Sequence, residues 1–467
     1  MLSQTRTIAL LVAAALFMQM LDNAIVNTAI PTMAKAFGVQ PLAMTAGITV
    51  YMLTMAVFIP IAGWMADRLG ARQVFLSAIV VFTLGSLFCG ISQDLGQFIL
   101  SRIVQGIGGA FMVPVGQIIV LRSAERGELL RALSLITWPA LFAPVLGPTI
   151  GGFITTYLSW RWNFFINIPL GLIALVLVPK FIPDDGVRLD RPLDWPGFIL
   201  SALGMGALLS GLDGLVHGEA DLALAGSLIA IGAVLCALAV RHMFTAKNPL
   251  LDFAAFRVDT FALSTLLCGS YYRVALNAMP FLLPLLFQVG FGLDPFQAGS
   301  LMMAYFAGNL GVRMITTPVF ERLGFRTAMF ANGLLSALGV GLCAALTAVT
   351  PAPLVIALLV FGGATRSLHY TGLNVLAFID IQPEQRSSAS TLATMLMQIT
   401  ILMGVVVGSL CLNLSQALRG AGQLQLVDFQ LSFIGLAGLT IVSAFMCLRL
   451  RRDAGHIPAA EPEQVIP

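Results

Sequence analysis

The sequence predicts an all-α polytopic membrane protein with fourteen transmembrane helices. Of its 467 residues, 58% are hydrophobic and only 10% are charged, and the mean hydropathy is +0.92. A soluble domain carries about 25% charged residues, so most of this surface cannot face water. Apolar runs of about twenty residues, enough to cross a hydrocarbon core of roughly 30 Å, recur along the whole chain.

The apolar runs between polar breaks define fourteen spans. The first is too long for the apolar region of a signal peptide and lacks a cleavage site, so it is expected to remain as a span. The ninth contains Pro280 and Pro284 and is expected to be kinked. The predicted limits are 7–29, 44–65, 73–92, 97–121, 131–156, 162–180, 194–213, 222–243, 260–290, 295–317, 327–349, 353–378, 388–413 and 428–449.

The distribution of Lys and Arg predicts the orientation, because these residues favour cytoplasmic loops. If both termini are cytoplasmic, eighteen of the 25 basic residues fall in inner loops and tails, and only Lys35, Arg161 and Arg419 fall in outer loops. Both termini are therefore expected on the cytoplasmic side. The remaining four basic residues lie within spans: Arg102, Arg273, Arg313 and Arg366.

An internal repeat divides the chain. "ADRLGARQVF" (66–75), after the second span, resembles "FERLGFRTAM" (320–329), after the tenth, with an acid, Arg, Leu, Gly and a second Arg in register. Internal repeats are typical of secondary transporters. The expected organisation is a six-helix bundle at 1–182, a linker with two inserted helices at 183–259, a second six-helix bundle at 260–450, and a disordered cytoplasmic tail at 451–467.

Several classes of protein find no support in the sequence. The net charge of +3 is spread over loops, so no nucleic-acid binding is expected. The six cysteines lie inside apolar runs without metal-ligand spacing, and neither a metal site nor a cofactor is expected. The scattered histidines and the lack of paired carboxylates argue against an enzyme. A G-x-x-x-x-G-K-[ST] loop for an ATP-driven pump is also absent from the sequence.

Four motifs occur in order at consecutive parts of the first half. They are "LDNAIVNTAIP" (21–31), "GWMADRLGARQ" (63–73), "LSRIVQGIGGA" (100–110) and "APVLGPTIGG" (143–152), and "WRWNFFINIPLG" (160–171) follows them. By these motifs and its span number, the chain resembles the fourteen-spanner drug:proton antiporters of the major facilitator superfamily. The resemblance implies the major facilitator fold, with two six-helix bundles around a central cavity and two extra helices.

The motif after the second span is expected to control the conformation. The resemblance implies that Asp67 helps to latch the inner end of the molecule shut in the outward-facing state. Arg68, Arg72 or a neighbouring helix would supply its hydrogen-bond donors, while Gly63 and Gly70 allow close packing and a tight turn. The alternative is a well-capped loop with positive-inside arginines.

The fifth span carries a second candidate for conformational control, formed by Gly147, Pro148, Gly151 and Gly152. Glycines at this spacing let helix backbones approach closely, and the proline bends the helix. The resemblance assigns this stretch to the interface between the two halves. Ordinary packing of a kinked helix is the alternative.

Asp22 and Arg102 are the buried charges of the first half. Counted along their spans at 1.5 Å per residue, they reach depths that differ by only a few ångströms, so they can form a pair. The functional interpretation is a proton switch, in which protonation of Asp22 releases Arg102. The alternative is a static buried salt bridge, which often adds nothing to stability.

The second half carries basic and amide side chains without a nearby acid in its spans. Each pair of these residues lies three or four positions apart, so that it shares a helical face. Arginine binds carboxylates well, and a group of such residues around the cavity favours an anionic cargo. A structural role, with hydrogen bonds to carbonyls or water, is the alternative, and His369 is also a candidate second proton site. The candidate cargo residues are Arg273, Asn277, Asn309, Arg313, Arg366 and His369.

These features predict a proton-coupled antiporter in the inner membrane of a bacterium. It is expected to work as a monomer in the lipid bilayer, driven by the proton gradient, and to export a small organic anion such as a di- or tricarboxylate. Multidrug efflux of lipophilic or cationic drugs is the alternative, and a passive channel or membrane sensor is an alternative of another class. Export itself is implied by the resemblance alone.

Overall fold

A computed structural model of the chain describes residues 4–123, 129–184, 186, 192–217, 222–246, 249, 253–381, 386–420 and 423–451. The regular structure in these residues is helical, which satisfies backbone N–H and C=O groups inside a lipid environment. The predicted tail lies outside them from residue 452 onward. The helices are α1 (Gln4–Phe37), α2 (Thr45–Phe58), η1 (Ile59–Ile61), α3 (Ala62–Leu69), α4 (Ala71–Ile91), α5 (Leu95–Ser123), α6 (Leu129–Tyr157), α7 (Trp162–Phe165), α8 (Asn167–Phe181), α9 (Trp195–His217), α10 (Leu222–Thr245), η2 (Phe253–Arg257), α11 (Asp259–Thr265), α12 (Cys268–Leu285), η3 (Leu286–Gly290), α13 (Pro295–Gly311), α14 (Arg313–Cys343), α15 (Ala352–Phe378), α16 (Arg386–Arg419) and α17 (Leu426–Cys447).

These helices account for the fourteen predicted spans. Within the described residues, twelve segments are long and apolar enough to cross a membrane. The other two predicted spans correspond to α6, whose first residues are only described as backbone, and to α13, which has 17 residues and continues into α14. Several spans are built from two or three helical pieces rather than one.

The internal repeat is visible in the backbone. Gly70 connects α3 to α4 with φ 96° and ψ 132°, and Gly324 interrupts α14 with φ 71° and ψ 156°. Both glycines occupy the same place in the repeated loop, and both adopt a positive φ that a side chain would strain. The repeated sequence therefore encodes the same sharp turn between consecutive spans.

The ninth span departs from its prediction. Its helix continues through Pro280 and Pro284, and the break lies earlier, at residues 266–267 between α11 and α12. The π-helical turn η3 begins at Leu286, two residues after Pro284. Prolines in this span therefore accompany a change of helical pitch, while its main interruption occurs at a Leu-Leu step.

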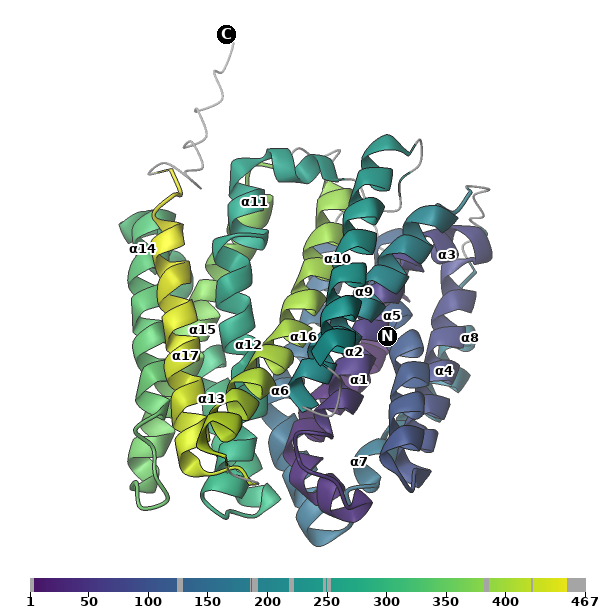
Figure 1. Cartoon of the computed structure of the whole chain (residues 1–467). Coiled ribbons are helices and arrows are strands. Elements are labelled where there is room, and N and C mark those ends of the chain that lie inside the picture. The colour runs from purple at the N-terminus through teal and green to yellow at the C-terminus, as the bar shows by residue number, and fades with distance from the viewer. Residues whose placement is uncertain are drawn as a thin grey trace.

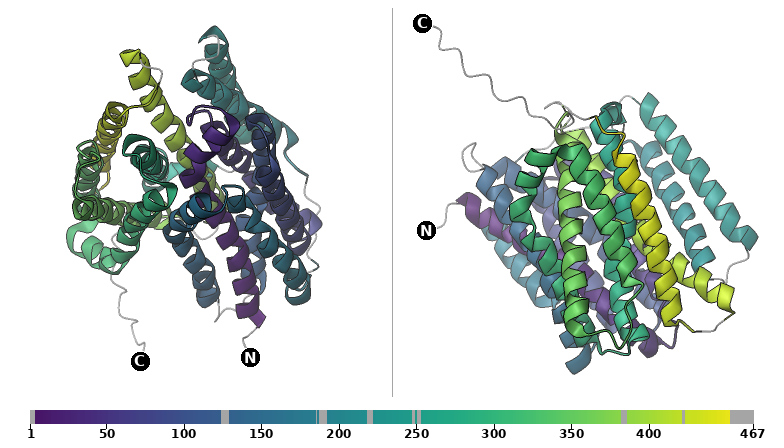
Figure 2. Two further views of the ribbon diagram at one scale, coloured as in Figure 1. Left: turned by 90° about the horizontal axis from the view of Figure 1, so that it is seen from below. Right: turned by 90° about the vertical axis from the view of Figure 1, so that its left-hand side faces the viewer.

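The two halves of the chain lie side by side (Figure 1), with the N-terminal helices in purple and blue and the C-terminal helices in green and yellow. Helix α6 packs along α13, and α2 packs along α16, so each seam joins one helix from each half. Helices α9 and α10 pack on each other at the edge of the molecule (Figure 2), and α9 contacts both α2 and α16.

The hydrophobic core is arranged differently at the two ends of the bundle. We call the end with the turns at 38–44, 158–161 and 291–294 the far end, and the end with the Gly70 and Gly324 turns the near end. One buried cluster joins far-end residues of the first half, such as Ile30 and Phe98, to the core of the second half. The near-end core of the first half, around Phe75, forms a separate cluster. The halves therefore share a core at the far end.

Candidate functional site

A buried ion pair lies inside the first half. Asp22 on α1 and Arg102 on α5 are each only 1% exposed, and the Oδ2 atom of Asp22 lies 2.9 Å from the Nη1 atom of Arg102. The two residues are 80 positions apart in the chain. The structure thus brings together the two charges that the sequence singled out as a possible pair.

Neutral side chains complete this pair. Gln105 donates from Nε2 to the Asp22 carboxylate at 2.9 Å, and Asn167 donates from Nδ2 to the same oxygen at 2.8 Å. The Oε1 atom of Gln105 accepts from Arg102 at 2.5 Å, and Ser86 accepts hydrogen bonds from both amides. We call Asp22, Arg102, Gln105, Asn167 and Ser86 the Asp22 network. All five side chains are buried.

Tyr51 closes this network on the side of α2. Its ring lies 3.9 Å from the Arg102 guanidinium, and Arg102 Nε also donates to the carbonyl of Gly47 at 3.3 Å. A cation over the face of a ring is attracted by the ring quadrupole, most strongly where water is excluded. The arginine is therefore held by a carboxylate, an amide, a carbonyl and a ring.

The network depends on the negative charge of Asp22. The ionised carboxylate accepts from Arg102, Gln105 and Asn167, and protonation removes the negative charge that balances Arg102. Breaking a buried pair by removing one charge is costly, because the other charge stays buried without compensation. Loss of the Asp22 charge would therefore leave Arg102 buried without a counter-charge.

Arg273 in the second half supports a break in its own span. Its Nη1 atom donates to the carbonyl of Ser264 at 3.0 Å, in the last turn of α11, and its Nη2 atom lies 3.5 Å from Oδ1 of Asn374. Carbonyls at the end of a helix have no partner within it, so an arginine can satisfy them. Arg273 is only 5% exposed.

Arg366 has a different environment. Its Nη2 atom lies 3.4 Å from Oδ1 of Asn277, and the same oxygen accepts from the Tyr370 hydroxyl at 2.7 Å. The guanidinium lies 5.0 Å from the Tyr370 ring and 5.9 Å from the rings of Tyr305 and Phe306. Within the described residues, neither Arg366 nor Arg273 has an acidic partner, and the Nε atom of each lacks a hydrogen bond. Arg366 is half-buried.

The other predicted cargo residues do not gather around Arg366. His369 is fully buried, stacks on Tyr272 at 3.7 Å between ring centroids, and lies 3.4 Å from the amide of Asn332. Asn309 on α13 is half-buried and forms no side-chain hydrogen bond with the described part of the chain. The side chain of Arg313 lies outside the described residues.

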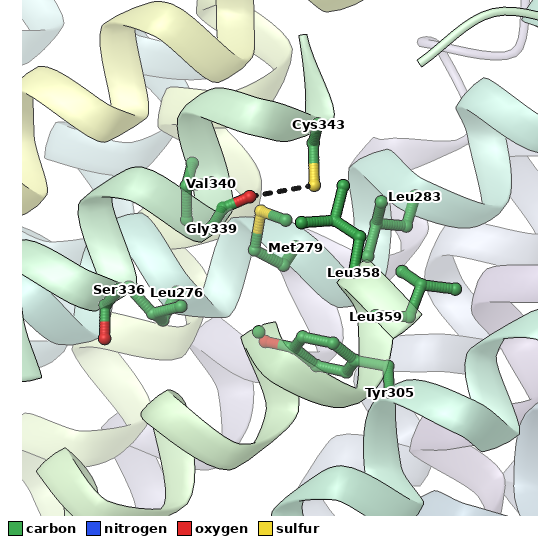
Figure 3. A pocket seen from close by; sticks show the side chains of 11 residues that line it. Leu276, Met279, Leu283, Tyr305, Ser336, Gly339, Val340, Cys343, Leu358 and Leu359 are labelled. Atoms are coloured by element: carbon green, nitrogen blue, oxygen red, sulfur yellow. Dashed lines mark hydrogen bonds between the residues drawn. The ribbon is translucent and has the colours of Figure 1, made fainter. Parts of the chain in front are cut away.

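A small apolar cavity lies inside the second half (Figure 3). Its volume is about 10 Å³, close to the space of one water molecule, and Leu276, Met279 and Leu359 contribute to its lining. Tyr305 also lines it, and its hydroxyl has no hydrogen-bond partner among the described residues. The cavity is too small for an organic cargo.

The glycine-rich stretch of α6 packs against two different helices. Gly147 and Gly151 face Ala24 and Ile25 of α1, within the first half. Gly152 faces the other half, because a Cβ there would fall on the carbonyl oxygen of Pro295. The carbonyl of Pro148 is equally close to the position of a Cβ on Gly299 of α13.

The sequence did not single out the other contacts of this far-end seam. The backbone N–H of Phe296 donates to Thr156 at 3.2 Å, and its ring packs on Phe153 and Tyr157. Gln288, in the π-helical turn, donates to the carbonyl of Thr28 on α1 at 3.0 Å. Hydrogen bonds, rings and close backbone packing together join the halves at this end.

The loop motif between α3 and α4 lies at the near end. Asp67 accepts from Arg122 of α5 at 2.6 Å, so a neighbouring helix supplies a donor to it. Arg72 donates to the carbonyl of Ile182 at 3.3 Å, Arg68 is exposed, and a Cβ on Gly63 would meet open space. In this conformation Asp67 is paired within the first half.

Comparison with known proteins agrees with the motifs. Residues 12–405 match the family model described as "Major Facilitator Superfamily". The chain is 38% identical over 452 residues to "Putative multidrug resistance protein MdtD" of Escherichia coli O6:H1, covering 95% of this chain and 94% of the relative. A protein of the same name from Shigella flexneri serotype 5b has the same identity and coverage. These matches confirm the resemblance.

Solved structures match the fold at low sequence identity. An auto-inhibited peptide transporter of the POT family gives a TM-score of 0.69 at 15% identity, covering 98% of this chain and 99% of that one. The xylose transporter XylE from E. coli, in a partially occluded inward-open conformation, gives 0.64 at 13% identity, covering 95% and 97%. They confirm the predicted all-helical transporter fold.

Proposed function

The chain belongs to the Major Facilitator Superfamily, and from this premise we propose that it is a proton-coupled antiporter that exports a small molecule by alternating access. As a member of this superfamily it is a multi-pass secondary transporter and not an enzyme. The coupling ion, the direction and the cargo are what we infer from the residues.

The buried Asp22–Arg102 pair is the observation that carries the proposal. Ionisable side chains inside a membrane segment are costly and mark ion or substrate pathways. A static pair offers no advantage in stability over apolar packing of similar volume. A carboxylate that alternates between charged and protonated forms does explain why the protein buries these charges. Each change of protonation would then change the contacts between α1 and α5.

Alternating access is supported by the unequal ends of the bundle. At the far end the halves share hydrogen bonds, aromatic contacts and a continuous core. The excess of Lys and Arg at the near end makes that end cytoplasmic by the positive-inside rule. The conformation is then one that is closed toward the periplasm of a bacterial inner membrane, and the Asp67 loop remains available to latch the cytoplasmic end in the opposite state.

The relatives favour small organic drugs as the cargo, since they are named for multidrug resistance. A second candidate, a small organic anion such as a di- or tricarboxylate, is favoured by Arg366. That arginine is half-buried, lacks an acidic partner among the described residues, and interacts there with neutral groups, Asn277 and Tyr370. Arg273 adds less to this candidate, because Ser264 and Asn374 already bind it.

Transport by the purified protein in proteoliposomes tests both parts. With an acidic lumen, a proton antiporter accumulates its cargo, and a protonophore abolishes the accumulation. A panel of ethidium, citrate and hydroxybenzoate separates cationic drugs from organic acids. Transport of a panel member that a protonophore leaves unchanged would indicate a passive channel and contradict the proposal.

A further inference from the structure

The internal repeat extends well beyond the loop that first revealed it. A constant offset of 254 residues, without gaps, relates residues from the first four spans to residues from the ninth to twelfth spans. The matching pairs are Asn23 and Asn277, Ala24 and Ala278, Tyr51 and Tyr305, Gly70 and Gly324, Gly108 and Gly362, and Gly109 and Gly363.

Structural roles follow the same offset. Gly70 and Gly324 make the same positive-φ turn. Tyr51 and Tyr305 are both buried and both lie beneath an arginine of the fourth span in their half, at 3.9 Å from Arg102 and 5.9 Å from Arg366. The offset therefore relates equivalent positions in space as well as in sequence.

The offset also gives the candidate cargo residues of α12 counterparts on α1. Arg273 and Asn277 correspond to Gln19 and Asn23, and both pairs are spaced i, i+4 on one helical face. Asn277 binds both Arg366 and Tyr370. Its counterpart Asn23 directly follows Asp22, so a cargo contact at this position would lie beside the Asp22 network.

The polar groups around Asn23 are short of partners. Among the described residues, Oδ1 of Asn23, Oε1 of Gln19 and the hydroxyl of Tyr51 are buried without a hydrogen bond of good geometry, and the Tyr51 hydroxyl interacts with the side chains of both Gln19 and Asn23. Gln19 and Tyr51 are both 0% exposed. A Cβ on Gly109 would lie 2.9 Å from the Tyr51 hydroxyl and 3.4 Å from the Gln19 amide, so these groups are close together. Buried polar groups normally make well-formed hydrogen bonds, and this cluster makes only poor ones with itself, so it can accept a further partner.

This face of α1 lies against the second half of the molecule. Val26 and Ile30, three and seven residues after Asn23, belong to the buried cluster that includes the core of the second half. Five residues after Asn23, the backbone carbonyl of Thr28 accepts a hydrogen bond from the Gln288 side chain. Helices α1 and α12 also contact each other directly. Asn23 therefore faces the region between the halves, where a cargo must bind in both conformations.

We propose that Asn23 is a cargo-binding residue of the first half, held in place by Gln19 and Tyr51, and that it takes a neutral hydrogen-bonding group of the cargo. Arg366 on the opposite half takes a carboxylate of the same molecule. The ligand class is an organic acid with a hydroxyl or amide group remote from its carboxylate. The inference rests on the proposed function, with an anionic cargo.

Tyr51 then connects cargo and proton. Its ring lies on the Arg102 guanidinium, while its hydroxyl lies beside Gln19 on the side of Asn23. A cargo group that binds Asn23 changes the surroundings of the Tyr51 hydroxyl, and the ring transmits this to Arg102. Tyr51 is a positioning residue in this scheme, because it acts through its neighbours.

Binding of two matched probes tests the assignment. Benzoate and 4-hydroxybenzoate share a carboxylate, and only the second has a remote hydroxyl. Wild type is expected to bind 4-hydroxybenzoate about tenfold more tightly, as one hydrogen bond to a buried partner allows. Asn23→Ala should reduce this preference to about one while leaving benzoate binding unchanged, and Arg366→Ala should weaken both probes equally. Gln97→Ala, an exposed amide, is the control.

Each other outcome is decisive. An unchanged preference in Asn23→Ala, equal weakening of both probes by that variant, or no binding of either probe to wild type would overturn the inference. The proposed function would survive these results if another cargo is still driven by the pH gradient. Asn23→Cys gives a second measurement, which can still be made if the variant binds its ligand weakly. Its thiol should react with a small polar maleimide and be protected by 4-hydroxybenzoate, and absence of that protection would also overturn the inference.

Discussion

The two halves use equivalent positions for different chemistry. In the first half Asp22 pairs with Arg102, and two amides complete the carboxylate's hydrogen bonds. The residue 254 positions later is Leu276, so the second half has no carboxylate at that place. Its arginine at Arg366 instead meets Asn277 and three aromatic rings.

In the proposed mechanism, this difference lets one repeated framework bind both a proton and an anionic cargo. A charge that is neutralised inside the protein can respond to a proton, since protonation unbalances it. A charge that has only neutral partners attracts an anion from outside. Under the proposed function, the first half carries the proton site and the second half carries the site for the carboxylate of the cargo.

The largest effect is expected when the carboxylate is removed from the first half. Asp22→Asn imitates the protonated form, so accumulation driven by a pH gradient should fall about 100-fold, the upper range of coupling between two sites. Exchange of labelled for unlabelled cargo should continue, because it needs no net proton movement. Asp94→Asn, an exposed carboxylate at the far end, should behave as wild type in both assays. Full pH-driven accumulation in Asp22→Asn would remove Asp22 as the proton carrier.

Removing the arginine from the second half should give the next largest effect. Arg366→Ala loses a charge-assisted hydrogen bond to an anionic cargo and should raise its KM about 30-fold. Arg273→Ala instead leaves the Ser264 carbonyl unsatisfied, so it should lower the thermal unfolding midpoint more than it changes KM. Equal KM effects in the two variants would mean that the comparison between these arginines is wrong.

The seam between the halves can be opened by one methyl group. In Gly152→Ala the new Cβ would overlap the Pro295 carbonyl, and overpacking of this kind costs about 1–3 kcal/mol. The population closed at the far end should therefore fall roughly tenfold relative to the open one, as measured by distances between spin labels on the two halves. Gly206→Ala, where a Cβ meets open space, is the matched control. An unchanged distance distribution in Gly152→Ala would show that this end does not open during the cycle.

A smaller shift in the same direction is expected for Gln288→Leu. It removes one hydrogen bond between the halves, worth about 1 kcal/mol, which corresponds to roughly a fivefold change in the same population ratio. The control is Gln93→Leu, the same substitution at an exposed glutamine. If Gln288→Leu leaves the ratio unchanged, its contact with Thr28 does not contribute to closure.

The sequence predicts the framework well, because the signals for it are local. Span number, the repeated loop and the family motifs depend on composition and on short stretches, and the fold and family follow from them. The Asp22–Arg102 pair could also be anticipated, since a buried charge needs a partner and depth along a helix can be counted. Gln105 lies three residues after Arg102 on the same helix, so counting along the helix also predicts that it lies near this pair.

The rest of the candidate site depends on contacts that no local pattern reveals. Asn167 reaches Asp22 across 145 residues, and neutral amides are frequent enough in spans to carry little signal. Arg273 binds the Ser264 carbonyl because the helix breaks at residues 266–267. Gly269 leaves room for that carbonyl, but a single glycine in a span carries little signal. His369 shares a face with Arg366 only loosely, so it packs on Tyr272 and Asn332 instead.

The central claim is that Asp22 gains and loses a proton inside the folded protein, and infrared difference spectroscopy measures this most directly. Acidifying purified wild type should produce a carbonyl band of a protonated carboxyl group that is missing from Asp22→Asn. Asp94→Asn should retain that band. Identical difference spectra of wild type and Asp22→Asn, across the pH range in which both stay folded, would show a static salt bridge and contradict the account.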